Sequence, residues 1–112
     1  MSNRVSLSPE MQYAIVDLSD NDTEVYAAPA QLIGVHVHTA LSAQACPIKD
    51  GGTSGVEPFN IPASTSAGTW IEGGNMRFAT TLHVDPDDSA TGQITVVYIP
   101  DNEGVAGSGQ NA

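Results

Sequence analysis

Two histidines separated by one residue are the first feature of this sequence that points to chemistry. His36 and His38 flank Val37, and in an extended strand their side chains share one face, roughly 6–7 Å apart. Two imidazoles at this spacing bind zinc or another divalent cation if a third ligand reaches them. His83, which we expect on the outward face of another strand, is the natural third ligand. The alternative is a pair of surface or interface histidines that are neighbours only because strand side chains alternate.

The histidine pair resembles part of the metal motif of the cupins, which are also small all-β proteins. In that motif a glycine is followed, after a five-residue gap, by His-x-His and then by a glutamate a few residues later. Here Gly34 precedes His36 by only two residues, and residues 39–46 contain no glutamate. Both departures count against a cupin-like metal-binding barrel, and we predict no bound metal or other cofactor.

The other candidates for chemistry have simpler explanations. The Asp-Pro-Asp-Asp run at 85–88 carries carboxylates of the kind that bind Ca²⁺, but Asp and Pro are also typical turn residues, and the EF-hand pattern is absent. Cys46, the single cysteine, alternates with Ile48 on a predicted strand, so we expect a packed core residue rather than a nucleophile. Residues 107–112 match the letters of a dinucleotide fingerprint without the strand and helix that it needs. We therefore predict no catalytic residue and no enzyme.

The charge balance argues against two classes of partner. The 112 residues include 13 acidic and three basic ones, and the formal net charge is −10. Nucleic-acid binding requires Lys and Arg to displace counterions from phosphates, and anionic membranes are disfavoured for the same reason. We expect neither nucleic acid nor membrane as a partner. The first residues lack the apolar core of a signal peptide, so we expect the chain to be made in the cytoplasm of its host.

Alternation of apolar and polar residues divides the chain into short strands. In the clearest of them, Ile33, Val35 and Val37 are expected to form the buried face. Pro58 indicates an edge strand, because proline cannot donate to the ladder. We expect the last two strands to pair as an antiparallel hairpin. The predicted strands cover residues 13–18, 24–28, 31–41, 43–49, 56–61, 69–72, 76–84 and 93–99.

Turn residues between these strands recur at spacings typical of an all-β sandwich or barrel. The sequence predicts an all-β fold, a single-domain antiparallel β-sandwich or a small jelly-roll-like barrel. We expect an N-terminal arm at 1–12, the β-sandwich domain at 13–100 and a flexible C-terminal tail at 101–112. A chain of this length buries roughly two-thirds of its unfolded surface, which is enough for one core between two layers.

A set of short sequence features lies between residues 31 and 100. They are a Gly34-Val35 strand, an Asp50-Gly51 turn, an Ile-Pro-Ala-Ser loop at 61–64, Phe78, and a DPDDSATG turn leading into the last strand at 85–98. In these features the chain resembles a group of small β-sandwich virion proteins of tailed bacteriophages and prophages. The resemblance implies a decoration, or cement, protein on the exterior of the capsid. Such proteins commonly assemble as homotrimers that bridge units of the major capsid protein. A head-fibre or tail-associated protein is the alternative that it leaves open.

A structural protein of this kind acts through its surface. Large aromatic side chains such as Trp70 often lie at the centre of interfaces, although they are as often part of a core. A flexible N-terminal arm suits strand addition to the sheet edge of a neighbour. The interface candidates are therefore Val5, Leu7, His36, His38 and Trp70.

Overall fold

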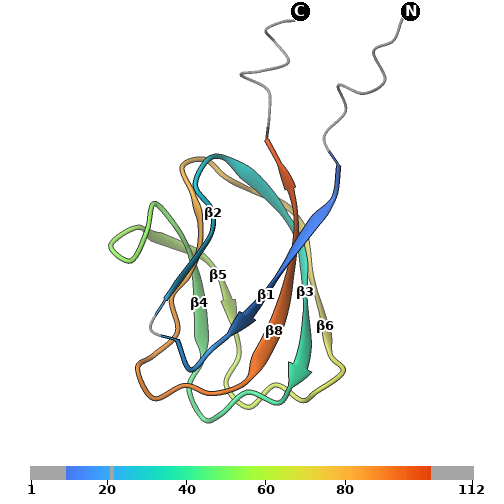
Figure 1. The fold of residues 1–112 in the computed structure, drawn as a ribbon, viewed down its shortest axis with the longest axis vertical. Helices are drawn as coiled ribbons and strands as arrows, with labels where there is room; N and C mark the ends of the chain where they lie inside the picture. The colour runs from blue at the N-terminus through green and yellow to red at the C-terminus, as the bar shows by residue number, and fades with distance from the viewer. Residues whose placement is uncertain (1–9, 21, 102–112) are drawn as a thin grey trace, which may run out of the picture.

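Two antiparallel β-sheets stack face to face in the computed structural model, which describes residues 10–20 and 22–101 (Figure 1). One sheet has the strand order β1-β8-β3-β6 and the other the order β2-β7-β4-β5, and these described ranges contain no helix. The strands are β1 (Gln12–Asp17), β2 (Thr23–Tyr26), β3 (Ala30–Thr39), β4 (Cys46–Asp50), β5 (Val56–Ile61), β6 (Trp70–Phe78), β7 (Leu82–Val84) and β8 (Gln93–Pro100). The prediction of an all-β sandwich is confirmed.

Every second residue of the strands contributes to the core between the two sheets. In β8, Ile94 and Val96 are completely buried, whereas Thr95 and Val97 between them lie on the other face and are half-buried. Removal of such apolar side chains from water is the dominant favourable term in folding. The largest fully buried side chains of this core are Phe78, Leu18, Leu32, Ile48, Ile61, Leu82 and Ile94.

A bulge in β3 changes which of its residues are buried. Against β8, the register shifts between Leu32 and Gly34 because Ile33 is an extra residue in β3. Against β6, the shift has the opposite sense, since the segment of β6 between Glu72 and Met76 is the longer one. Leu32 and Val35 are therefore both buried although they are three positions apart, and Ile33 is only half-buried. The predicted alternation is right from Val35 to Val37 and wrong at Ile33.

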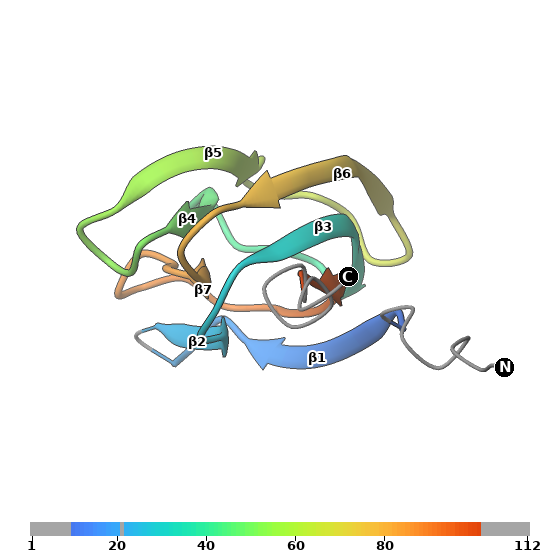
Figure 2. The same cartoon turned by 90° about the horizontal axis from the view of Figure 1, so that it is seen from above.

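The predicted strand over 76–84 is wrong, because the chain turns a corner inside it. β6 ends at Phe78 in one sheet and β7 begins at Leu82 in the other, as Figure 2 shows. Asp50 stabilises the corner, since its carboxylate accepts hydrogen bonds from the backbone N–H groups of residues 79, 80 and 81 at 2.9, 2.7 and 3.2 Å. Apolar alternation continues across the corner because both strands face the same core, so the pattern alone does not reveal the change of sheet.

The predicted turn at 73–75 lies inside β6. Gly74 and Asn75 adopt positive φ angles of 65° and 58°, yet β6 stays paired with β3 on both sides of them, at Glu72 and at Met76. The turn-forming residues therefore produce an irregularity in one strand rather than a connection between two.

The last strand does not form the predicted hairpin. β8 lies between β1 and β3 in the middle of its sheet and pairs with both of them. The prediction that residues 56–61 form an edge strand is confirmed, since β5 is the last strand of its sheet. Of the predicted arm, Gln12 belongs to β1, and residues 1–9, with Val5 and Leu7, lie outside the described residues, as does the tail from 102.

Candidate interaction surface

Large exposed hydrophobic side chains gather on one face of the sandwich. Of five such residues in the described ranges, four lie on the outer face of the β1-β8-β3-β6 sheet: Met11, Tyr13, Ile15 and Trp70. The fifth, Val56, lies on β5 in the other sheet. We call this surface the outer face and define it by Met11, Tyr13, Ile15, His36, His38, Trp70, Thr95 and Val97.

Strand register aligns the outer face into rows that cross the sheet. Ile15 of β1 lies opposite Thr95 of β8, Thr95 lies opposite His36 of β3, and His36 lies opposite Trp70 of β6. Directly opposite residues point to the same side of a sheet, with their Cβ atoms about 4.5–5.5 Å apart. One row thus carries an aliphatic, a hydroxyl, an imidazole and an indole side chain across all four strands.

A shallow hollow of about 510 Å³ lies at the β1 side of the outer face. Apolar side chains form most of its surface, with few polar groups among them. Its lining residues are Met11, Gln12, Tyr13, Ile15, His38, Thr95 and Val97. Exposed apolar patches with polar groups at their rim are one of the features that mark interaction sites and binding grooves.

The two neighbouring histidines both lie on the outer face. Their ring centroids are 4.9 Å apart and the rings meet edge to face at 82°. The ring nitrogen Nε2 of His38 shares a hydrogen bond of 2.5 Å with the hydroxyl of Thr95. The pair is therefore part of the same surface as Trp70, the third interface candidate that the structure describes.

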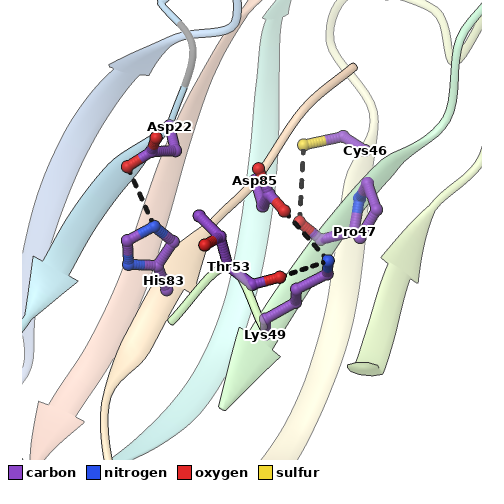
Figure 3. Close-up of polar contacts among 7 residues, drawn as sticks. All are labelled: Asp22, Cys46, Pro47, Lys49, Thr53, His83 and Asp85. Atoms are coloured by element: carbon purple, nitrogen blue, oxygen red, sulfur yellow. Dashed lines mark hydrogen bonds and ion pairs between the residues drawn. The ribbon is translucent and has the colours of Figure 1, made fainter. Parts of the chain in front are cut away.

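His83 does not join this pair. It lies on β7 in the other sheet and is buried, only 7% exposed, rather than on an accessible outward surface. Its Nε2 lies 3.1 Å from the carboxylate oxygen Oδ1 of Asp22, and its Nδ1 is buried without a hydrogen-bond partner (Figure 3). Among residues 10–20 and 22–101, no group of three or more His, Cys, Asp or Glu side chains is placed to hold a metal ion. The three-histidine metal site is not formed.

The indole of Trp70 occupies the space over Gly34 of β3, which has no side chain. A Cβ atom at Gly34 would come within 2.3 Å of the indole carbon Cζ2 and within 2.8 Å of the carbonyl oxygen of Ile71. The indole N–H donates to the carboxylate of Glu72 at 3.2 Å. This close approach explains why Trp70 is 46% exposed although it is the largest side chain on the face.

The remaining reactive groups have structural roles. Cys46 is completely buried, as predicted, and burial, with a smaller contribution from the charge of Asp85, raises the pKa of its thiol to about 12. Lys49 binds Asp85 at 2.9 Å and donates to the carbonyl of Thr53 at 2.9 Å (Figure 3). A thiol with this pKa is protonated at neutral pH and is a poor nucleophile.

The acidic run at 85–88 leads into a turn that closes between the carbonyl of Asp87 and the N–H of Ala90 at 2.9 Å. Asp87 accepts hydrogen bonds from the backbone N–H and the hydroxyl of Ser89, at 2.9 and 2.8 Å. These bonds lower the pKa of its carboxyl. Asp85 is paired with Lys49 of β4. The carboxylates of this run therefore stabilise a turn and an ion pair to a neighbouring strand.

The β1 part of the outer face was not predicted from the sequence. The signal was present, because Tyr13 and Ile15 alternate with the inward-facing Ala14 and Val16, so both faces of β1 are apolar. β8 shows the same property with Val97. A strand with two apolar faces in a two-layer sandwich presents one of them to solvent or to a partner.

No known protein family, curated protein or solved structure matches the chain. None of the described residues belongs to a helix long and apolar enough to cross a membrane.

Proposed function

We propose that this protein is a non-enzymatic structural protein of a bacteriophage particle. In this role it decorates the outside of the head as a homo-oligomer and stabilises the shell by bridging units of the major capsid protein. The observation that carries the proposal is the concentration of exposed apolar side chains on the outer face. The resemblance of residues 31–100 to small phage virion proteins supports the assignment to a virion. The net charge of −10 suits a protein that works among nucleic acids without binding them.

The physical basis of such a function is the burial of surface at many equivalent sites. Full burial of an exposed isoleucine contributes roughly 1.5–3 kcal/mol, and covering Ile15, which is 58% exposed, contributes about half of that. Each subunit then needs to bind only weakly, because linked subunits engage the shell together and their contacts reinforce one another.

The proposal is tested by binding of the purified protein to heads of the phage whose genome encodes it. The test variant is Trp70→Gln, and the matched control is Val56→Gln, which alters an exposed hydrophobic residue on the other sheet. We expect saturable binding of the wild type, at least about tenfold weaker binding of Trp70→Gln, and unchanged binding of Val56→Gln. Urea unfolding of both variants checks that the fold is kept.

Purified tails provide a second arm of the same experiment. Binding to tails in place of heads supports the head-fibre or tail-associated alternative. Absence of binding to either, or equal loss with both variants, contradicts the proposal.

A further inference from the structure

The four edge strands of the two sheets differ in how well they are protected against pairing. β5 contains Pro58, which cannot donate, and β2 has only four residues and a register shift. β6 is irregular at Gly74 and Asn75, where φ is positive. Bulges, prolines and short length are the usual means by which proteins blunt their edges.

β1 is the edge that carries none of these features. Its six residues pair with β8 in unbroken register and include no proline or lysine. In Figure 2 no other described strand lies beyond it. Its outward side chains Tyr13 and Ile15 are 69% and 58% exposed.

The hydrogen bonds at the end of β1 identify the backbone groups that point to the open edge. The N–H of Leu18 donates to the carbonyl of Gly92 at 2.8 Å, one step beyond the pair Asp17–Gln93. Hydrogen-bonded and non-hydrogen-bonded pairs alternate along an antiparallel ladder. Val16 and Ala14 therefore bond to β8, and the N–H and C=O groups of Tyr13 and Ile15 point away from the sheet. The N–H of Asp17 points the same way, whereas its C=O accepts a hydrogen bond from the N–H of Asp20 at 3.0 Å.

We propose that this open edge pairs with the same edge of a second copy of the chain, antiparallel, about a two-fold axis at Ala14. Tyr13 of one copy then exchanges both backbone hydrogen bonds with Ile15 of the other, and the two Ala14 residues face each other as a non-hydrogen-bonded pair. The two sheets become one continuous sheet, and their outer faces join into one larger apolar surface.

The sequence of β1 is complementary to itself in this register. Tyr13 lies opposite Ile15, an aromatic and β-branched pair of the kind that stabilises antiparallel strands. Asp17 lies opposite Met11, so the two Asp17 carboxylates are at opposite ends of the paired segment, roughly 20 Å apart. A shift by one residue would place inward side chains opposite outward ones.

Cysteine cross-linking tests the axis directly. In Ala14→Cys the two introduced thiols face each other across the axis at a spacing suited to a disulfide, and the native Cys46 is buried and protonated. Thr95→Cys on β8 is the matched control, because its two copies would lie roughly 16 Å apart, three strand spacings across the sheet and two residues along it, beyond disulfide reach. Under mild oxidation we expect a covalent dimer of Ala14→Cys and no dimer of Thr95→Cys.

Sedimentation of the full chain measures the assembly itself. We expect a species of twice the 11.6 kDa chain mass. Ile15→Pro removes an N–H that points to the open edge and spares the bonds to β8, so we expect a dimer dissociation constant at least about tenfold higher. Ile15→Thr, which keeps the N–H, should weaken the dimer less. A monomer at every concentration, a species of three copies, or equal cross-linking of both cysteine variants would overturn the proposal, whatever the result with phage heads.

Discussion

Substitution of Gly34 by alanine tests how Trp70 is held on the outer face. The added Cβ would lie 2.3 Å from Cζ2 and 2.6 Å from Cη2 of the indole, and 2.8 Å from the carbonyl oxygen of Ile71. All three distances are shorter than real Cβ contacts, so the indole must move and β3 must shift against β6. Forced overpacking of this kind costs typically 1–3 kcal/mol.

The loss of stability in Gly34→Ala has two sources, the contact of the new Cβ with the Trp70 indole and its contact with the Ile71 carbonyl. The indole is a side chain that can turn away, whereas the carbonyl of Ile71 belongs to the backbone and cannot. We therefore expect Trp70→Ala to relieve part of the cost of Gly34→Ala and not all of it. A double-mutant cycle should give a coupling energy in the range of about 0.5–3 kcal/mol.

Trp70 is the only tryptophan of the chain, so its fluorescence reports on this site alone. The assay is urea unfolding at neutral pH, followed by tryptophan emission for the variants that retain it and by circular dichroism for all four members of the cycle. We expect Gly34→Ala to lower the free energy of unfolding and to shift the emission of the folded state to the red, because the displaced indole becomes more exposed. Unchanged stability together with unchanged emission would refute the packing of the indole on Gly34.

Two further predictions concern the rest of the sandwich. Burial raises the pKa of Asp50, but hydrogen bonds from residues 79, 80 and 81 outweigh it and hold the pKa below its usual value. The ionised carboxylate therefore stabilises the folded state above the unfolded pKa of about 3.9, and this stabilisation is lost as the pH falls through the folded pKa. We expect Asp50→Ala to cost roughly 1–2 kcal/mol in urea unfolding at pH 7, with a smaller difference from the wild type near pH 2; a difference that does not change with pH would contradict the role of the carboxylate. Cys46 is buried and its pKa is raised to about 12, so we expect iodoacetamide at pH 8 to leave it unmodified in the folded protein and to alkylate it in urea. Mass spectrometry measures the alkylation, and rapid alkylation of the folded chain would contradict the burial of Cys46.

The fold class and the positions of several strands follow from the sequence because they depend on local alternation. The segments 31–41, 56–61 and 93–99 each correspond to a strand in the structure within about two residues. Pairing does not follow in the same way. β8 lies between β1 and β3 because of contacts between residues far apart in the chain, which no local pattern encodes.

The corner after Phe78 shows the limit of periodicity. Apolar alternation runs through it because β6 and β7 line the same core from different sheets, and the side chain that fixes the turn, Asp50, is distant in sequence. The candidate site was predictable in part. His36 and His38 were placed on one face by spacing, whereas their alignment with Trp70 and Ile15 depends on the register of four strands.

If the outer face is the working surface of this protein, it is covered when the protein binds phage heads, and carbene footprinting detects this. The labelling of each side chain is compared by mass spectrometry between the protein bound to phage heads and the same protein free in solution at equal concentration. We expect protection of Met11, Tyr13 and Trp70 on heads and unchanged labelling of Val56 on the opposite sheet. Protection of Val56 with unchanged labelling of Tyr13 and Trp70 would show that the other sheet, and not the outer face, meets the head.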